Sequence, residues 1–250
     1  MKLDKLKKCF RPLKKFLKVH LRLSNLYSRY LKDYSILKKL IDEDGIYILT
    51  KYDSGPCIFD NIGFTPIEPV YFLQDIWFAR KIFELKPKVH YDIGSSVKTL
   101  SIISQFTSVN MVDIRPIDMQ VENFNFIKGD ILNLPFANNS INSLSSLCVI
   151  EHIGLGRYGD EIDSEGSEKA INEIKRVLMS DGNLYISLPV DEQNKIYFNA
   201  HRAFTRDYIM ELFSELLLIE EKYIYGLEVF PSYYKEKGFG TGLFHFKKNA

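Results

Sequence analysis

Apolar residues at the start of the chain recur every three or four positions, which is the spacing of one face of an α-helix. Lysine and arginine fill most of the positions between them. The apolar stripe consists of Leu3, Leu6, Phe10, Leu13, Leu17 and Leu21. The pattern predicts a basic amphipathic helical arm over residues 1–40. Because Pro12 lacks an amide hydrogen, we expect this arm to break or kink near Arg11 into two pieces.

Residues 41–69 lack a helical period and are rich in turn-forming pairs. These pairs include Asp44-Gly45 and Gly55-Pro56. We therefore expect a short hairpin and irregular connection here. Periodicity returns over 70–85, where the pattern predicts a helix with Phe72, Ile76, Ala79 and Phe83 on one face, ended by Pro87.

Beyond residue 87, short apolar runs alternate with helical segments. The expected strands cover 88–93, 109–113, 124–128, 143–150, 184–189, 217–228 and 241–248. The expected helices lie near 96–106, around Ile171, Ile174 and Leu178 up to Asp181-Gly182, and after an N-cap at Thr205. Such alternation predicts an α/β domain over 70–250 with a mostly parallel seven-stranded sheet. The last two strands have no helix between them, so we expect one of them to be antiparallel.

Three of the expected strands lead directly into an acidic residue: Asp92, Asp113 and Asp130. In a doubly wound sheet the carboxyl ends of the strands border one crevice where ligands bind. Asp113 follows Asp92 by 21 positions, close to the spacing at which an acid reaches ribose hydroxyls. Gly94 lets the first turn approach a ligand closely. A nucleoside site is the leading hypothesis, although acidic residues also follow strands simply because loops are polar.

Several classes of protein are disfavoured by composition and motifs. The dinucleotide fingerprint G-x-G-x-x-G and the P-loop are absent from the sequence. Cys9, Cys57 and Cys148 form no Cys-x-x-Cys pair, so we expect no metal site, no disulfide framework and a reducing, cytoplasmic location. No apolar run is long enough for a membrane span, and the basic N-terminus resembles no secretory signal.

The charge of the chain is unevenly distributed. The total is +1, which gives no overall attraction to nucleic acid. Residues 1–40 hold 13 lysines or arginines and only two acids, Asp4 and Asp33, so the arm carries +11 and the remainder −10. A basic amphipathic helix is typical of peripheral contact with an anionic membrane, here the inner membrane. Two alternatives stay open: packing on the acidic remainder, or a solvated arm.

The glycine-rich loop 151–160 is a second candidate site, because it follows the fourth expected strand. Glu151 and His152 offer acid–base groups, and Arg157 could hold a phosphate or carboxylate. The segment after the fifth strand should reach the same rim with Asn199, His201 and Arg202. The expected catalytic residues are therefore His201, His152, Glu151 and Arg157, and the expected substrate-binding residues are Tyr158, Asn199 and Arg202. Alternatively, the arginines only pair with Asp160 or Glu151 to fix loops. Cys148 is expected in the core.

The turn Asp92-Ile-Gly94-Ser resembles the first motif of S-adenosylmethionine-dependent methyltransferases. Gly129 to Phe136, Ser140 to His152 and Ala170 to Gly182 resemble later segments of that superfamily. The resemblance implies a Rossmann-like class I fold with S-adenosylmethionine as cofactor, Asp113 on ribose and Asp130 on adenine. The implied cofactor-binding residues are Asp92, Gly94, Ser95, Asp113, Ile114, Asp130 and Ile131.

A narrower resemblance rests on longer strings of residues. They are Trp77 to Lys81, Asp92 to Ser95, Asp113 to Pro116, Glu151 to Asp160, Phe198 to Arg202 and Gly240 to Phe244. Over about residues 70–248 the chain resembles the methyltransferase-like family of domain of unknown function 268 (DUF268). That resemblance implies a link to bacterial surface polysaccharides and indicates the fold more strongly than the activity. Our hypothesis is O-methylation of such a polysaccharide or its precursor, with a glycan or sugar nucleotide as substrate.

Two positions depart from the superfamily motif. Ser96 and Lys98 stand where glycines let the backbone approach the cofactor. Either the loop opens differently, or the ligand is not S-adenosylmethionine. Two alternatives to methyl transfer therefore stay open: other glycan or phosphate chemistry on this fold, and a non-catalytic assembly partner at the membrane edge.

Overall fold

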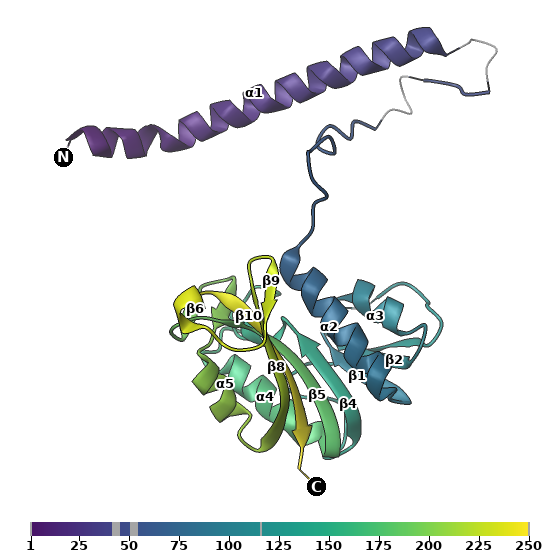
Figure 1. Ribbon diagram of the computed structural model, residues 1–250, viewed down its shortest axis with the longest axis vertical. Helices are drawn as coiled ribbons and strands as arrows, with labels where there is room; N and C mark the ends of the chain where they lie inside the picture. The colour runs from purple at the N-terminus through teal and green to yellow at the C-terminus, as the bar shows by residue number, and fades with distance from the viewer. Residues whose placement is uncertain (1, 42–45, 51–54, 116, 250) are drawn as a thin grey trace. The chain divides into compact units, whose positions relative to one another are not determined.

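The computed structural model describes residues 2–41, 46–50, 55–115 and 117–249, and side chains from residue 19 onward (Figure 1). The chain divides into two compact units, Met1–Pro66 and Ile67–Ala250.

The first unit contains one long helix, α1 (Lys2–Leu40), as the apolar period predicts. The expected break near Arg11 was wrong, because the helix continues through Pro12. A proline removes one backbone hydrogen bond, and the good helix formers around it, leucine and lysine, favour continuation. After α1, residues 46–50 and 55–68 contain no strand in the described part of the segment. The turn expected at Asp44-Gly45 lies outside the described residues.

The second unit is built on a large sheet. The strands are β1 (Val89–Ile93), β2 (Ser108–Asp113), β3 (Phe124–Lys128), β4 (Ile141–Leu147), β5 (Leu178–Val190), β8 (Leu216–Tyr225), β9 (Glu228–Phe230) and β10 (Gly240–Lys248). Among the described residues they form one eight-stranded sheet in the order β3-β2-β1-β4-β5-β10-β8-β9. The first five pair in parallel, and β10 is antiparallel to both its neighbours, as expected. The short β9, which pairs with β8, is the additional strand.

Helices cover both faces of this sheet (Figure 1). They are α2 (Pro69–Leu85), α3 (Val97–Ile103), α4 (Gly166–Val177) and α5 (Arg206–Leu212), with short 3₁₀ turns at Ile150–His152 and Lys235–Lys237. Buried residues of α2 and α3 join one core cluster, and those of α4 and α5 join another. A small hairpin of β6 (Lys195–Tyr197) and β7 (His201–Ala203) lies outside the sheet. This is the α/β architecture expected from the alternating pattern.

The junction after α4 differs from the sequence prediction. We expected the helix to extend through Leu178 to Asp181-Gly182, but it ends at Val177 and Leu178 begins β5. Asp181 adopts a φ of 60°, and the pairing register with β4 shifts beside it. Asp181-Gly182 therefore forms an irregularity inside a strand rather than a helix stop, because the buried Leu178 pairs with Ile141 in the sheet.

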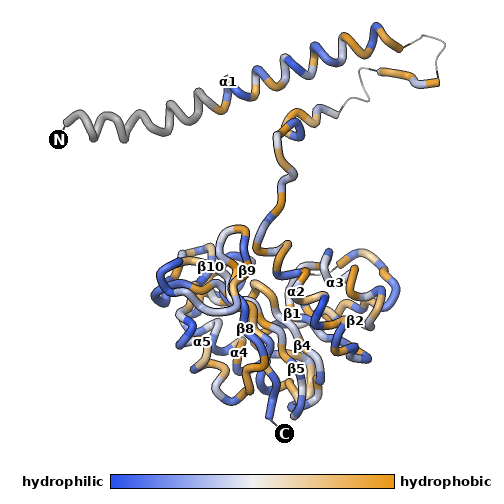
Figure 2. The backbone as a smooth tube through the Cα atoms, viewed as in Figure 1, coloured by the Kyte–Doolittle hydropathy of each residue, from blue (hydrophilic) through white to orange (hydrophobic). Residues whose placement is uncertain are grey.

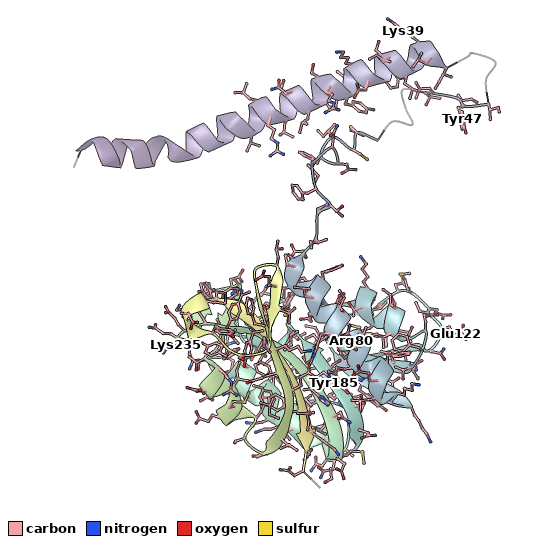
Figure 3. All side chains as sticks on the ribbon, viewed as in Figure 1. Lys39, Tyr47, Arg80, Glu122, Tyr185 and Lys235 are labelled. Carbon is pink, nitrogen blue, oxygen red and sulfur yellow. The ribbon has the colours of Figure 1, made fainter. Side chains whose placement is uncertain are left out.

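The face of α2 that packs on the sheet is not the apolar face that the spacing of Phe72, Ile76, Ala79 and Phe83 defines. Gln74, Trp77, Phe78 and Ile82 are buried, whereas Phe72, Ile76 and Phe83 are exposed. Trp77 and Phe78 both contact the ring of Tyr185 on β5, which Figure 3 labels. The helix has two apolar faces, and the face that carries Trp77 packs on the sheet. Periodicity cannot distinguish two such faces.

Candidate functional site

A cavity of about 560 Å³ lies at the carboxyl ends of the parallel strands. This is the edge where open α/β sheets bind ligands, and the volume suits a small organic molecule. Residues following β1, β2, β3 and β4 contribute to its wall. The lining consists of Ile93, Gly94, Val112 to Arg115, Gly129 to Leu132, Cys148, Val149, His152 to Gly154 and Tyr158 to Asp163.

Gly94 forms the tight turn after β1. Its φ is 70°, and a Cβ atom there would come within 3.0 Å of Val149 Cγ1. Asp92 is fully buried beneath the turn and does not line the cavity. Its Oδ1 accepts a hydrogen bond from the Ser95 amide at 2.9 Å, and its Oδ2 accepts one from the Ser145 hydroxyl. Ser95 is also buried, and its Oγ accepts from the Leu147 amide. Asp92 and Ser95 therefore shape the turn from outside the cavity wall, where we had expected cofactor-binding residues.

A chain of buried polar groups continues under this turn. His90 bonds Ser143 and Ser145 through its two ring nitrogens, each at 2.8 Å, and Ser145 in turn bonds Asp92. Burial lowers the pKa of His90 to about 3. Burial also raises the pKa of Asp92 to about 6, although hydrogen bonds from Ser145 and Ser95 act in the opposite direction. This hydrogen-bonded network therefore supports the turn, and its histidine, His90, is neutral.

Asp113, at the end of β2, lines the cavity and is bound by Arg115. The Arg115 amide lies 2.8 Å from Asp113 Oδ1, and the guanidinium contacts both carboxylate oxygens at 3.2 Å. The same guanidinium lies 4.9 Å from the ring of Tyr158, whose ring also lies 5.2 Å from Arg157. Tyr158 thus joins the end of β2 to the loop after β4. The Asp113–Arg115 pair joins an exposed guanidinium to a largely buried carboxylate, since 61% of the Arg115 side chain but only 9% of the Asp113 side chain is exposed.

Asp130 follows β3 on the same wall. Its Oδ1 accepts from the Leu132 amide at 2.9 Å, and no hydrogen bond in the described structure engages its Oδ2. Ile114, Ile131 and Leu132 line the cavity beside it. The wall therefore combines apolar side chains for a flat ring with a carboxylate that can accept from an amine.

Ser96 and Lys98 do not line the cavity. Ser96 is the N-cap residue of α3, and Lys98 is exposed in the first turn of that helix. The substitutions at motif positions therefore neither fill the cavity nor add a cation to its wall.

The loop after β4 is organised by Asp160. Its Oδ2 accepts from the amides of Gly154 at 2.7 Å and Gly156 at 3.2 Å, and its Oδ1 accepts from Tyr158 at 3.1 Å. Partial burial acts to raise the pKa of Asp160, but these amides outweigh it and the pKa is lowered. Gly154 has a φ of 80°, and a Cβ there would come within 2.3 Å of the Asp163 carbonyl oxygen. The glycine at this position is thus a packing requirement.

His152 is the one expected catalytic residue in the cavity wall. Its Nδ1 lies 2.6 Å from the Ala200 carbonyl oxygen, so Nδ1 carries the hydrogen and Nε2 the lone pair. Burial lowers the pKa of His152 to about 4, even though the Ala200 carbonyl acts to raise it. The imidazole is therefore neutral near pH 7 and able to accept a proton at Nε2.

Glu151 lies behind His152, outside the cavity wall. It is fully buried, and its Oε1 lies 3.7 Å from His152 Nε2. Its Oε2 has no hydrogen-bond partner among the residues that the structure describes. Burial raises the pKa of Glu151 to about 8. The carboxyl group is therefore protonated near pH 7, and its expected role as a catalytic group in contact with substrate is not supported by its position.

The raised pKa of Glu151 predicts a pH-dependent stability. Between about pH 4.5 and 8 the unfolded chain releases a proton that the folded chain keeps, so the free energy of unfolding falls as pH rises. The slope approaches about 1.4 kcal/mol per pH unit. Urea unfolding of the wild type and Glu151→Gln at pH 5 and pH 8 measures this. The variant should lose less stability across this interval, and equal losses would contradict the buried, protonated state.

His201, Asn199 and Arg202 do not line the cavity, which corrects three expected positions. His201 packs against the rings of Tyr197 and Phe239, at 4.9 and 5.4 Å between centroids. Asn199 is exposed in the hairpin turn with a φ of 59°.

Arg202 is a buried structural residue. Its guanidinium donates to the carbonyl oxygens of Ile153, Asp163 and Ser164 and to Ser167 Oγ. It therefore fixes the ends of the glycine-rich loop, through carbonyl groups rather than through the acids that we had considered.

Arg157 lies at the rim, outside the cavity wall. Its Nη1 donates to the Ala200 carbonyl at 3.0 Å, next to the bond from His152. Tyr158, by contrast, lines the cavity.

Cys148 is a cavity residue that sequence reasoning missed. It directly follows β4 with a φ of 53° and is only partly buried. Its Sγ lies 3.1 Å from Gln74 Oε1 and 3.3 Å from Ser187 Oγ, and burial raises its pKa well above the ordinary value. The sequence places it inside the strand because the apolar run continues to Ile150, and no residue of that run marks the strand end at Leu147.

Two negative findings apply to the described residues. No group of His, Cys, Asp and Glu side chains there is arranged to hold a metal ion. No helix in the described part of the chain combines the length and the apolarity that crossing a membrane requires.

The fold is shared with solved methyltransferase structures. The N-methyltransferase NodS of Bradyrhizobium japonicum WM9, solved with S-adenosyl-l-homocysteine, is 14% identical, covers 86% of this chain and 97% of its own, and has a TM-score of 0.54. The 1,6-didemethyltoxoflavin-N1-methyltransferase of Burkholderia thailandensis, with bound S-adenosylhomocysteine, is 14% identical, covers 76% and 94%, and has a TM-score of 0.52. The cyclase SpnF is 11% identical, covers 69% and 81%, and has a TM-score of 0.51. At these identities the likeness establishes the fold alone.

Sequence comparisons identify the family. The search of curated proteins finds no match. The family model described as "Caenorhabditis protein of unknown function, DUF268" matches residues 96–220, which is half of the chain. This stretch includes β2, β3 and β4, the glycine-rich loop and α4. With a Rossmann-like methyltransferase fold and a match of this extent, the chain belongs to the DUF268 family.

Proposed function

We propose that this protein is an S-adenosylmethionine-dependent methyltransferase. The observation that carries the proposal is the cavity at the ends of β1, β2 and β3, where Gly94, Asp113 and Asp130 contribute to one wall. The lining suits S-adenosylmethionine: apolar side chains can contact its base, and carboxylates can accept from its hydroxyl and amine groups. Arg115, a cation in the lining, is paired with Asp113.

The residues of this chain have distinct binding roles in the proposal. Gly94 admits the ligand to the backbone turn, and Asp113 accepts hydrogen bonds from ribose hydroxyls. Asp113 keeps that capacity beside Arg115, because two carboxylate oxygens offer about four acceptor sites and Arg115 uses three. Asp130 accepts from the adenine amine through its Oδ2, while Ile114 and Ile131 contact the faces of the base.

The bound cofactor would supply an electrophilic methyl group. An acceptor hydroxyl that forms a bond to that carbon must lose its proton, and we propose that His152 Nε2 accepts it. The imidazole is neutral, and the Ala200 carbonyl orients it through Nδ1. Placement of the acceptor oxygen in line with the methyl carbon would provide most of the rate enhancement, and the general base would increase it further.

We propose that the acceptor is a hydroxyl of a bacterial surface polysaccharide or its precursor. The resemblance to the family supports this class of substrate. Tyr158, which is 44% exposed, and Arg157 lie where such a molecule would approach His152. Arg157 uses one guanidinium nitrogen on Ala200 in the described structure, and the others suit a carboxylate or phosphate on a sugar.

Calorimetry with S-adenosylhomocysteine tests the cofactor site. The wild type should bind S-adenosylhomocysteine. Asp130→Ala should raise its dissociation constant by about tenfold, which corresponds to the loss of one hydrogen bond to a charged group. Asp113→Ala should have a comparable effect. Asp118→Ala, an exposed acid outside the cavity, is the control and should bind like the wild type. Absence of heat with the wild type, or equal binding by all three variants, would contradict the proposal.

We also propose that the arm of residues 1–40 attaches the protein to the anionic surface of the inner membrane. Its charge of +11 supports this, as does the exposure of Leu21 and Leu31 on α1. Full-length protein should sediment with phosphatidylglycerol vesicles at low salt and lose this binding at high salt. Sedimentation that depends on neither the vesicle charge nor the salt concentration would contradict this proposal.

A further inference from the structure

The face of α2 that points away from the sheet carries a stripe of apolar residues. Phe72, Ile76, Ala79 and Phe83 follow one another at intervals of four, three and four residues. Phe72 is 51%, Ile76 47% and Phe83 62% exposed. Figure 2 shows apolar colour along this helix. We call these four residues the α2 stripe.

The α3 region enlarges the apolar surface. The rings of Phe83 and Phe106 contact each other edge to face, with 6.3 Å between centroids. Phe106 and Ile102 are exposed as well. An apolar surface that spans two helices differs from single exposed residues, which are normal, and marks a place where something binds.

The spacing of the α2 stripe identifies the shape of its partner. Alternating intervals of three and four residues form the seam by which one helix packs against another. A small residue between larger ones, here Ala79 between Ile76 and Phe83, leaves room for a side chain of the facing helix. The partner is therefore a helix with a similar seam.

Charged residues end the stripe on both sides with opposite signs. Glu68 is the N-cap residue of α2, one turn before Phe72. Lys86 is the C-cap residue, and its Nζ lies 5.5 Å from the centroid of the Phe83 ring. Two copies of α2 side by side in opposite directions place Glu68 of each copy beside Lys86 of the other. A parallel pair would place like charges together.

The flanks of the stripe do not suit an anionic membrane. Asp75 and Glu84 lie on α2 together with Arg80, which Figure 3 labels, so the helix has no uniformly basic face. A helix that lies in a charged lipid surface needs such a face.

We infer that the α2 stripe is the contact surface of a two-fold symmetric dimer, in which α2 of one copy packs antiparallel on α2 of another. A two-fold interface uses the same surface on both copies, so a stripe that is self-complementary in charge satisfies its symmetry. Phe72 then faces Phe83 of the second copy, and Ile76 faces Ala79. The inference does not depend on the proposed reaction.

Sedimentation equilibrium of the full chain tests the dimer. The wild type should associate reversibly to twice the chain mass. Phe83→Glu should raise the dimer dissociation constant by about 30-fold or more, because it replaces an aromatic contact with Phe72 of the second copy by a buried charge. Leu227→Glu is the matched control, since Leu227 is similarly exposed but lies in the turn between β8 and β9. Circular dichroism verifies that both variants are folded.

A charge exchange tests the antiparallel direction. Glu68→Lys and Lys86→Glu should each weaken association about two- to fivefold, because each puts like charges together. The double variant should regain wild-type association. Failure of the double variant to recover would overturn the antiparallel arrangement.

Three results would overturn the inference altogether. The first is a wild type that stays monomeric up to millimolar concentration. The second is a dimer that Phe83→Glu leaves intact. The third is a monomer in which Phe83→Glu abolishes binding to phosphatidylglycerol vesicles, which would assign the α2 stripe to lipid.

Discussion

Replacement of His152 by alanine should lower the rate of methyl transfer by about 10²–10⁴-fold, the usual contribution of a general base. The expectation follows from position: among the histidines of the second unit, His152 lines the cavity, and its Nε2 carries the lone pair. Binding of S-adenosylhomocysteine should change little, because Gly94 and Asp130 remain in place. Single-turnover rates and calorimetry on the same preparations separate the two effects.

Two further variants distinguish a base from a residue that only positions the loop. His152→Asn keeps a donor toward the Ala200 carbonyl but removes the base, so it should be nearly as slow as His152→Ala. His201→Ala removes a histidine outside the cavity wall and should retain most activity. Wild-type rates in His152→Asn, or a greater loss in His201→Ala, would contradict the assignment.

Arg202→Ala should have the largest effect on stability, about 3 kcal/mol or more. The side chain is 4% exposed and donates to three carbonyl oxygens and one hydroxyl. Its removal takes hydrogen bonds from the buried Ser167 hydroxyl and from three carbonyl oxygens of partly or fully exposed residues, and a buried acceptor left without a donor costs about 1–3 kcal/mol. The free energy of urea unfolding measures the effect.

Arg115→Ala is the matched control for Arg202. Its side chain is 61% exposed, so the loss of stability should stay within about 1 kcal/mol. Similar losses in the two variants would show that Arg202 does not hold the glycine-rich loop. A folded Arg202→Ala should also bind S-adenosylhomocysteine more weakly, because Ile153 and Asp163 belong to the cavity wall.

The positions of Gly94, Asp113 and Asp130 in the cavity wall could be predicted from the sequence because that argument depended on topology alone. Parallel strands bring their carboxyl ends to one edge, so Asp113, Asp130 and Gly94 had to lie near one another once the strands were recognised. Ile114 and Ile131 line the same cavity for that reason. The end of a strand strongly constrains where the next residue lies, because the strand fixes the position at which that residue's backbone begins.

The rest of the candidate site could not be predicted, because it depends on the direction of side chains and on which backbone groups lack partners. His152 and His201 both follow strands, yet the hairpin of β6 and β7 turns His201 toward Tyr197 and Phe239. Arg202 has the chemistry of an anion-binding residue, but nearby carbonyl groups use its hydrogens. Sequence spacing contains no information about those carbonyls.

Hydrogen–deuterium exchange of the full-length protein with and without S-adenosylhomocysteine tests the central claim most directly. We predict slower amide exchange in peptides that contain Gly94, Ile114 and Ile131, and little change in α1 or in the β6–β7 hairpin. These three segments follow β1, β2 and β3 and line the same cavity. Unchanged exchange in all three under saturating ligand, or protection confined to another part of the chain, would contradict a cofactor site at this edge of the sheet.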